Sequence, residues 1–389
     1  MSEPIDRRML LAGAGLATVA APAFAQSTAQ GNAVSEQGAP TGPEPGATHR
    51  IRFAVIGLDH AHIYAMTDAL IRGGGTLAMV HAADPAQLAM FRKRYGDVKV
   101  ARSEAEVLED RRVQLVASAA VPDLRAPLGI RVMRAGKDFL SDKPGITDLD
   151  QLAAVRRAVA ETKRKFAIMF SERFEVRAAV RAGELVKAGA IGRVLQTVNL
   201  APHRLSAPTR PDWFWDVARY GGILTDIGSH QADQFLFYTG STAAHVVAAQ
   251  AGNVAMPERP RFQDFGDMML SGNGGTGYVR VDWYTPAGMP TWGDGRLFIL
   301  GTEGSIELRK YVDIAGRPGG DHLFFADRQG VRHIDCRDVR LPFGADFVRD
   351  VAERSERAQN QAQALLASEL VLTAQRDAMP VGVRPTSTG

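Results

Sequence analysis

The segment Ile51-Arg52-Phe53-Ala54-Val55-Ile56-Gly57 decides the fold of this chain. It is a short, apolar, β-branched run that ends in glycine, which is typical of a buried strand leading into a tight turn. Further elements are expected around it: helices at residues 60–71 and 128–135, and strands at 76–81, 113–120 and 137–140. Strands that alternate with helices at these lengths predict an α/β fold with a Rossmann-type, doubly wound parallel sheet.

The turn after the first strand carries an altered form of the glycine fingerprint that binds dinucleotides. In the pattern G-x-G-x-x-G, Gly57 would be followed by two glycines where the chain has Asp59 and His62. The second glycine normally lets the backbone approach a pyrophosphate, and an anionic side chain there repels it unless it is paired. The prediction that this domain binds a nucleotide therefore depends on the topology and on Asp84. Asp84 lies 27 residues after Gly57 and can accept hydrogen bonds from ribose hydroxyls.

The same turn has a second interpretation, as a metal site. Asp59, His60 and His62 are three potential ligands within four residues, but the spacing shows no fourth ligand. We predict no metal, and expect these side chains to cap the turn or to contact cofactor and substrate. The expected cofactor is NAD or NADP, either exchanged or retained in tightly bound form. The residues expected to bind it are Gly57, Leu58, Asp59, His60, Asp84, Pro122 and Lys143.

The pattern changes after Gly189. Before that point, helices are expected at residues 148–162 and 174–188, with a strand at 166–170. After it, several runs alternate with period two, and we expect strands at 194–200, 244–251, 265–270, 276–284, 296–301, 305–308 and 322–326. Gly272-Asn273-Gly274-Gly275 is a hairpin turn signal, and 346–376 predicts a closing helix pair or one long helix. This order indicates a C-terminal α+β domain built around one open, mostly antiparallel sheet.

Two distant segments place Lys, Asp and His where one cleft can hold them. In Ser141-Asp142-Lys143-Pro144, the lysine lies where a strand of the α/β domain ends, which is where such domains hold their chemistry. In the segment 221–230, GGILTDIGSH, Asp226 and His230 lie four residues apart, so one turn of helix puts them on one face. Such a set suits abstraction of a hydroxyl proton while a hydride leaves the same carbon. We expect Lys143, Asp226 and His230 to be catalytic.

The loop before this segment combines charged and aromatic residues. Trp213, Trp215 and Tyr220 are interleaved with Asp216 and Arg219. Such a loop suits a sugar, which offers hydroxyls to charged groups and an apolar face to rings, although ordinary loop packing has the same composition. The residues expected at the substrate are Arg173, His203, Trp213, Trp215 and Tyr220, with Tyr284, Trp292 and His322 as weaker candidates.

The chain opens with the parts of a Tat-type export signal. Arg7 and Arg8 precede a short apolar run at residues 12–22 and an A-x-A end, Ala23-Phe24-Ala25. The run is too short to span a bilayer as a permanent helix. We expect recognition by the Tat translocon, cleavage after Ala25 and a periplasmic protein, with an uncleaved N-terminal anchor as the alternative.

Composition limits the partners and the domain organisation. Lys and Arg number 46 against 43 Asp and Glu, and no basic tract is interleaved with aromatics, so neither nucleic acid nor a membrane is expected as a partner. The lone Cys336 excludes an intramolecular disulfide and a cysteine-based zinc site. The predicted organisation is a signal peptide at 1–25, a flexible arm at 26–48, a dinucleotide-binding domain at 49–170 and a substrate and oligomerisation domain at 171–389.

Several short motifs follow one another in the order typical of one family. They are Ala135-Gly136-Lys137, Asp142-Lys143-Pro144 in place of Glu-Lys-Pro, Arg173-Phe174, a G-x-I-G-x-V segment at 189–194, a G-G-x-L-x-D-x-G-x-H segment at 221–230 and a G-T-x-G segment at 301–304. In this order and spacing, the chain from about His49 to Met379 resembles the Gfo/Idh/MocA oxidoreductases, the group of glucose–fructose oxidoreductase and inositol dehydrogenase.

The resemblance implies a nicotinamide cofactor in the first domain and a substrate on the open face of the second domain's sheet. It places Lys143, Asp226 and His230 at the catalytic positions, and the sequence departs from the family at Asp59, His62 and Arg125. We expect a homo-oligomer, a dimer or a tetramer. The predicted function is a periplasmic NAD(P)-dependent oxidoreductase of a sugar, cyclitol or sugar derivative. The alternatives are an NAD- or metal-assisted glycoside hydrolase or lyase, and a non-catalytic sugar-binding protein.

Overall fold

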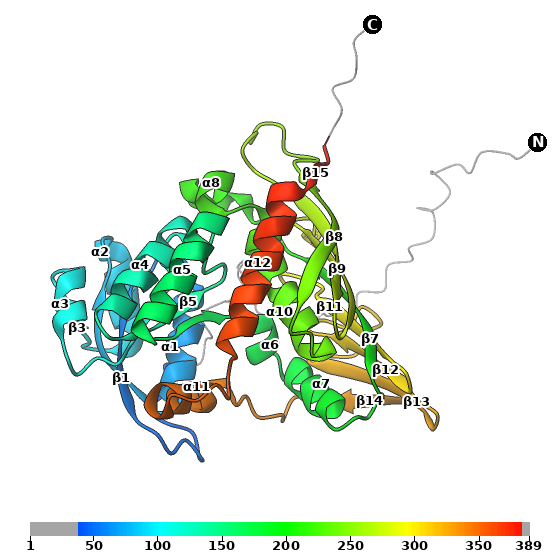
Figure 1. The fold of residues 1–389 in the computed structure, drawn as a ribbon, viewed down its shortest axis with the longest axis horizontal. Coiled ribbons are helices and arrows are strands. Elements are labelled where there is room, and N and C mark those ends of the chain that lie inside the picture. Colours follow the sequence, from blue (N-terminus) through cyan, green and yellow to red (C-terminus); the bar gives the residue numbers. More distant parts are fainter. Residues whose placement is uncertain (1–37, 383–389) are drawn as a thin grey trace, which may run out of the picture.

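The computed structural model describes residues 38–382 of the chain. The predicted signal peptide and the arm up to residue 37 lie outside the described residues. Within residues 38–382, no helix is both long and apolar enough to span a bilayer. The chain between these limits forms two sheets with helices packed against them (Figure 1).

The first sheet is entirely parallel, with its strands in the order β3-β2-β1-β4-β5-β6. Its elements are β1 (Ile51–Ile56), α1 (His62–Arg72), β2 (Gly75–His81), α2 (Pro85–Tyr95), β3 (Lys99–Val100), α3 (Glu104–Glu109), β4 (Leu115–Ser118), α4 (Pro122–Arg134), β5 (Asp138–Asp142), α5 (Leu149–Thr162) and β6 (Phe166–Met169). This is the doubly wound order in which the strand direction reverses between β1 and β4, so that a crevice forms at the carboxyl ends of these strands.

Local chemistry determines where several of these helices begin. The carboxylates of Asp84 and Asp148 accept from backbone N–H groups in the first turns of α2 and α5, and the Ser103 hydroxyl does the same for α3. Gly57 ends β1 with a φ of +84°, and a Cβ there would lie 2.7 Å from the Cβ of Ala120. Only glycine fits this turn, because the backbone is both left-handed and in contact with the loop after β4.

The second sheet has nine strands in the order β14-β13-β12-β11-β7-β10-β9-β8-β15. Its neighbours pair antiparallel except for β7 with β10 and β8 with β15. The strands are β7 (Val194–Pro202), β8 (Ala244–Gly252), β9 (Phe265–Gly272), β10 (Gly275–Asp282), β11 (Arg296–Gly301), β12 (Gly304–Arg309), β13 (His322–Asp327), β14 (Gly330–Asp335) and β15 (Met379–Pro380). The parallel sheet and this mixed, mostly antiparallel sheet confirm the predicted fold class.

Helices join the two sheets. The remaining ones are α6 (Ser171–Phe174), α7 (Arg177–Lys187), α8 (Val217–Tyr220), α9 (Ile223–Asp226), α10 (Gly228–Thr239), α11 (Phe343–Glu353) and α12 (Gln361–Asp377), with 3-10 turns η2 (Ala207–Thr209) and η3 (Asp212–Trp215). Helix α10 packs on β7 and β10, whereas α11 returns to pack on α1. Helix α12 contacts α5 and β6 on one side and β8 and α10 on the other, and so lies between the two parts of the molecule (Figure 1).

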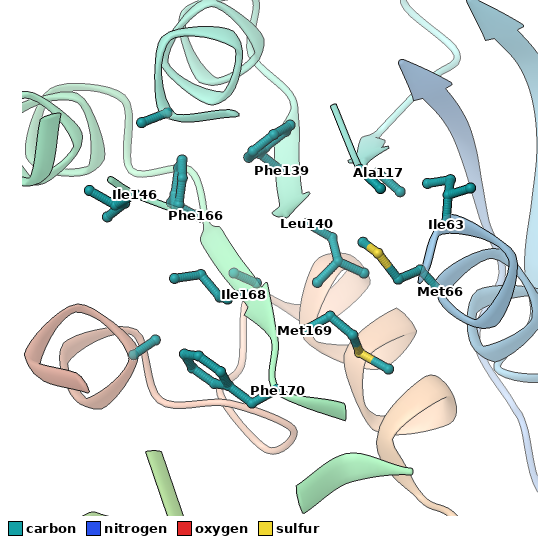
Figure 2. Packing of buried hydrophobic residues seen from close by; sticks show 14 of the residues in the cluster. Ile63, Met66, Ala117, Phe139, Leu140, Ile146, Phe166, Ile168, Met169 and Phe170 are labelled. Carbon is teal, nitrogen blue, oxygen red and sulfur yellow. The ribbon is translucent and has the colours of Figure 1, made fainter. Parts of the chain in front are cut away.

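One hydrophobic cluster continues from the first sheet into the second domain. At its centre, the rings of Phe139 on β5 and Phe166 on β6 lie 5.3 Å apart and are fully buried. Figure 2 shows this pair beside Ile146, with Leu140 and Met169 facing Ile63 and Met66 of α1. Packing on both faces therefore fixes the position of β5, whose carboxyl end carries Asp142 and Lys143.

The observed helices and strands have the types expected from the sequence, but some of them begin or end at other residues. Helix α4 begins at Pro122, earlier than the expected 128, and β14 and the segment from α2 to α3 were not expected. Helix α2 has one buried apolar residue, Phe91, so its sequence lacks the apolar periodicity that marks an amphipathic helix. The expected hairpin at 272–275 is present between β9 and β10, and the expected closing helices form a pair, α11 and α12.

Truncation of the central aromatic pair tests this description of the core. We expect Phe139→Ala to lower the free energy of unfolding by about 3–5 kcal/mol, because the change leaves a cavity between β5 and α4. Met90→Ala, at a side chain that is 61 % exposed on α2, is the control and should change it by less than about 0.5 kcal/mol. Urea unfolding measures both; equal effects of the two substitutions would contradict the packing.

Candidate active site

A pocket lies where the carboxyl edge of the first sheet meets the second domain. Its first-domain wall comes from the turn after β1, the start of α4 and the end of β5, and its second-domain wall comes from α6, α9, α10 and the loops after β7, β10 and β12. The residues that carry charge or rings are Asp59, His60, His62, Arg125, Lys143, Glu172, Glu175, His203, Arg210, Trp213, Phe214, Asp226, His230, Trp283, Trp292 and Tyr311. The pocket is therefore on the helical side of the second sheet and not on its open face.

An ion pair between Lys143 and Asp226 spans the pocket. Lys143 Nζ donates to Asp226 Oδ1 at 2.8 Å, and the two side chains are only 7 % and 13 % exposed. Burial alone would raise the pKa of Asp226, but the Lys143 ammonium and its hydrogen bond outweigh burial and lower it. Asp226 is therefore an anion that holds a charged lysine at the end of β5.

The residue before this lysine is the centre of a buried polar cluster. Asp142 Oδ1 accepts from His62 Nδ1 at 2.7 Å and from the Lys143 backbone N–H at 2.8 Å. Its other oxygen, Oδ2, lies 3.1 Å from Arg125 Nη2 and 3.3 Å from His60 Nδ1. Burial would raise the pKa of Asp142, but the charges and hydrogen bonds around it hold the pKa well below its usual range. A fully buried carboxylate is thus kept ionised by its neighbours.

Arg125 fixes the backbone around this cluster. Its guanidinium donates to the carbonyl oxygens of Ala120 and Lys143, each at 2.6 Å, and of Pro144 at 3.0 Å, and its side chain is 1 % exposed. The Lys143–Pro144 peptide bond is cis. One buried cation therefore ties the loop after β4 to the end of β5, and this positions Lys143 in the pocket.

The second-domain wall holds two histidines beside a buried ion pair. Lys310 Nζ donates to Glu172 Oε2 at 2.6 Å, and although burial raises the pKa of Glu172, Lys310 lowers it below its ordinary value. Burial lowers the pKa of His230 to about 3 and that of His203 to about 4. Both imidazoles are therefore neutral at pH 7, and the Nδ1 atom of His230 is buried without a hydrogen-bond partner.

The first domain carries features that fit the two nucleoside ends of a dinucleotide. Asp84 is exposed at the end of β2, where Oδ1 accepts from the Ala86 N–H at 2.8 Å and Oδ2 is left for another donor. Gly57 brings the backbone of β1 against the β4 loop, and Pro122 and Lys143 stand at the pocket edge. These are the positions at which doubly wound domains hold the adenosine ribose and the nicotinamide.

The diphosphate of a dinucleotide would lie between these ends, against the turn after β1, whose sequence is unusual. The first-turn N–H groups of α1 at His62, Ile63 and Tyr64 already have partners within the turn. Burial raises the pKa of the Asp59 carboxyl above its usual value, although the Arg125 charge opposes this. A nucleotide would therefore depend less on glycine backbone here than in the usual fingerprint.

Eight of the expected residues line this one pocket: Asp59, His60, Pro122, Lys143, His203, Trp213, Asp226 and His230. Asp226 ends α9 and His230 lies in α10, so two short helices and not one present them. Of the weaker candidates, Trp292 lines the pocket, Tyr284 is 43 % exposed, and His322 pairs with His333 at 3.1 Å between β13 and β14.

Three residues expected at the substrate do not line the pocket. Arg173 forms a buried ion pair with Asp233 and stacks on Phe174 and Phe237. Tyr220 is buried, and its hydroxyl oxygen accepts from the Gln263 N–H. Trp215 packs edge-on against Phe214 and lies under Arg259. Each has a packing role, because a charged or aromatic residue in a loop is compatible with a core position that the sequence does not reveal.

Several residues of the site had no sequence signal strong enough to single them out. Asp142 belongs to the Asp-Lys-Pro motif and Arg125 is a departure from the family, and neither position by itself predicts a buried ion pair. Glu172 and Lys310 are 138 residues apart and meet only in the fold. For Asp142, the signal available was two charged residues at the end of a buried strand, a place where charges need partners.

Comparison with known proteins finds a family model that matches part of the chain. Residues 179–307 match the model of the GFO/IDH/MocA C-terminal domain. The chain is 28 % identical over 204 residues to inositol 2-dehydrogenase of Rhizobium meliloti (strain 1021), a match that spans 52 % of this chain and 58 % of that protein. It is 48 % identical to a predicted oxidoreductase from Erwinia carotovora atroseptica, whose structure aligns with a TM-score of 0.83 over 85 % of this chain and 100 % of the other.

The fold is shared more widely. A structure of levoglucosan dehydrogenase in complex with NADH aligns with a TM-score of 0.68 over 85 % of this chain and 98 % of the other, at 19 % identity. At this identity the likeness concerns the fold alone.

The buried neutral histidine makes stability depend on pH. The pKa of His230 falls from about 6.5 in the unfolded chain to about 3 in the fold, so the unfolded state binds the extra proton between these values. Its contribution to stability is complete above pH 6.5 and is lost as the pH falls, by about 1.4 kcal/mol per pH unit.

We therefore expect wild type to lose about 2 kcal/mol more stability than His230→Gln between pH 6.5 and 5. Urea unfolding at each pH measures the difference. His245→Gln, at an exposed histidine on β8, is the control and should follow the wild-type pH profile. Parallel profiles of wild type and His230→Gln would contradict the burial of a neutral imidazole.

Proposed function

We propose that the chain is an oxidoreductase of the Gfo/Idh/MocA family and that it interconverts a CH–OH group and a carbonyl of a sugar, cyclitol or sugar derivative with NAD or NADP. The observation that carries this proposal is the Lys143–Asp226 pair, which stands where the nicotinamide edge of the first domain opens into the pocket. A charged donor at this place can hold the oxygen of the reacting carbon.

The proposal assigns different roles to the three polar residues. Asp226 accepts a hydrogen bond from Lys143 Nζ and so orients this group, which donates a second hydrogen bond to the substrate oxygen. His230 is neutral, so one of its ring nitrogens carries a lone pair that can accept the hydroxyl proton, and its Nδ1 has no hydrogen-bond partner. Arg125 holds the backbone of Lys143 and thereby positions the ammonium. When bound, the nicotinamide supplies hydride acceptance or donation, with Gly57, Asp84 and Pro122 as the residues that would hold the cofactor.

The walls of the pocket support a carbohydrate-like substrate. Trp213, Trp283 and Trp292 offer apolar faces, and Glu172 and Arg210 offer charged groups beside them. A sugar or cyclitol ring has apolar C–H faces and a rim of hydroxyls, and this mixture of rings and charges matches both.

The nature of the bound nucleotide tests the proposal most simply. Protein purified in its folded form is denatured, and the absorbance and mass of any released nucleotide are recorded; a chain that releases none is titrated with NADH and NADPH by fluorescence. We expect retained NAD(P) or saturable binding. A chain that neither retains nor binds a nicotinamide nucleotide would instead have a sugar-binding or non-redox role.

The proposal also includes the cellular location of the protein and its oligomeric state. The paired arginines and the A-x-A end of residues 1–25 support export through the Tat pathway to the periplasm. Exposed apolar side chains on the outer face of the second sheet, among them Val247, Met269 and Leu300, support self-association into a dimer or tetramer.

The carboxylate at the end of β2 should contribute to cofactor binding. We expect Asp84→Ala to weaken NAD(H) binding by a few-fold to tens-fold, about 1–2 kcal/mol, through the loss of hydrogen bonds from ribose hydroxyls. Fluorescence titration of NADH measures the affinity. Asp97→Ala, at the exposed carboxylate after α2, is the matched control. An unchanged affinity in Asp84→Ala would remove Asp84 from the site.

Lys143 and His230 should determine the rate of turnover. We expect Lys143→Ala and His230→Ala each to lower turnover by roughly 10²–10⁴, the usual effect of a positioned acid–base group, while nucleotide binding persists. Asp226→Asn should slow turnover less, since the lysine keeps a hydrogen-bond partner but loses its counter-charge. Initial rates of NAD(P)H formation measure these effects. Full turnover in the Lys143 and His230 variants would exclude this mechanism.

Export should depend on the paired arginines. We expect Arg7→Lys combined with Arg8→Lys to leave the protein in the cytoplasm, because the Tat pathway recognises the two guanidinium groups. Cell fractionation measures the distribution, with Arg50→Lys, outside the predicted signal, as the control. Unchanged periplasmic recovery of the double variant would contradict the export signal.

A further inference from the structure

Two imidazoles and one carboxylate converge at the first-domain wall of the pocket. His60 and His62 come from the turn that leads into α1, and Asp142 comes from the end of β5. One donor atom from each residue lies within 4.8 Å of the others. His62 Nδ1 is 2.7 Å from Asp142 Oδ1, and His60 Nδ1 is 3.3 Å from Asp142 Oδ2. No other group of this kind is present in residues 38–382.

We propose that His60, His62 and Asp142 bind a divalent transition-metal ion such as Zn²⁺ or Co²⁺. Two imidazole nitrogens and one carboxylate oxygen are a common donor set for these ions. Ligand atoms about 2.0–2.2 Å from such an ion lie roughly 3.0–3.4 Å from one another. The two separations to Asp142, 2.7 and 3.3 Å, are near this size, and all three donor atoms lie within 4.8 Å of one another, so side-chain movements would bring them onto one ion.

The hydrogen bonding of Asp142 supports the site independently of these distances. Asp142 is 1 % exposed, and its Oδ2 atom forms no hydrogen bond. Its neighbours are Arg125 Nη2 at 3.1 Å and His60 Nδ1 at 3.3 Å, so a metal ion would give this buried oxygen the direct bond that neither neighbour makes. Its Oδ1 atom accepts from the Lys143 N–H, which holds the carboxylate so that Oδ2 faces His60. Asp142 can therefore coordinate through Oδ2 and keep its backbone contact.

The neighbouring cations determine which class of ion fits. Arg125 Nη2 lies 3.1 Å from Asp142 Oδ2 and neutralises most of its charge. A hard ion such as Mg²⁺ or Ca²⁺ depends on several anionic oxygens, which this cluster lacks. Zn²⁺ and Co²⁺ take much of their affinity from imidazole nitrogen, and the cluster offers two. Arg125 is anchored by three carbonyl oxygens, so it orients the carboxylate from behind.

The ion would also have an open side. His60 and His62 both line the pocket, and Lys143, Trp213 and Asp226 line it around them. Three protein ligands leave at least one coordination position for water or for an oxygen of a bound molecule, as in metal sites that bind ligands. The site would therefore place a Lewis acid beside the Lys143–Asp226 pair and not in a closed structural position.

Metal binding is tested directly on untagged, full-length protein. The metal content of the purified protein is measured by mass spectrometry, the protein is treated with a chelator, and Co²⁺ and Zn²⁺ are titrated by calorimetry and by the visible absorption of Co²⁺. We expect one ion per chain, with Zn²⁺ displacing Co²⁺. His60→Gln and His62→Gln should each weaken Co²⁺ binding by about tenfold or more. Mg²⁺ should not compete at equal concentration.

A matched control separates this site from other histidines. His322→Gln removes one imidazole of the His322–His333 pair, outside the pocket, and should leave Co²⁺ binding unchanged. Circular dichroism and thermal unfolding verify that each variant is folded. Absence of stoichiometric Co²⁺ or Zn²⁺ binding, or binding that survives both pocket substitutions, would overturn the proposal.

The experiment is independent of the proposed oxidoreductase activity. NADH titration of the metal-free protein is measured in parallel. Nucleotide binding without metal binding refutes only the metal site. Metal binding without nucleotide binding supports the metal site and refutes only the dinucleotide function.

Discussion

The ion pair between Lys143 and Asp226 is the interaction on which the site depends. It joins the end of β5 in the first domain to the end of α9 in the second, and both side chains are nearly removed from water. A buried charge without its partner is strongly destabilising, so each domain supplies what the other needs. The cluster of Asp142 and Arg125 below the pair fixes the backbone of Lys143 in the same way. The site therefore assembles only when the two domains are packed correctly against each other.

The rest of the fold positions these charged side chains through packing. Packing of Phe139 and Phe166 fixes β5, and α12 between the two sheets fixes the distance from β5 to α9 and α10. The second domain then brings neutral imidazoles, a buried Glu172–Lys310 pair and three tryptophans to the opposite wall. The cofactor contacts are thus assigned to the first-domain wall and most substrate contacts to the second-domain wall, and separate substitutions can test each.

The sequence predicted the elements that repeat a simple period, and it predicted less well the residues whose roles depend on distant partners. The strands of both sheets and the Asn273-Gly274 hairpin follow from apolar patterns and turn chemistry. Lys143 and Asp226, expected in one cleft, meet in the structure because strand ends and helix starts have defined places in this topology. Arg173 and Tyr220 are charged or polar residues whose partners, Asp233 and Gln263, no local pattern identifies. The network around Asp142 was missed for the same reason, since Arg125 comes from the start of another helix.

Transfer of a carbon-bound hydrogen to the cofactor tests the central claim most directly. The protein is incubated with NAD⁺ or NADP⁺ and a panel of cyclitols and aldohexoses deuterated on carbon, and the mass of the reduced nucleotide is measured. The account predicts that at least one member yields reduced nucleotide carrying one deuterium, and that Lys143→Ala abolishes the signal while leaving nucleotide binding intact. Reduced nucleotide without deuterium, or no reduced nucleotide with any member of the panel, would contradict hydride transfer in this pocket.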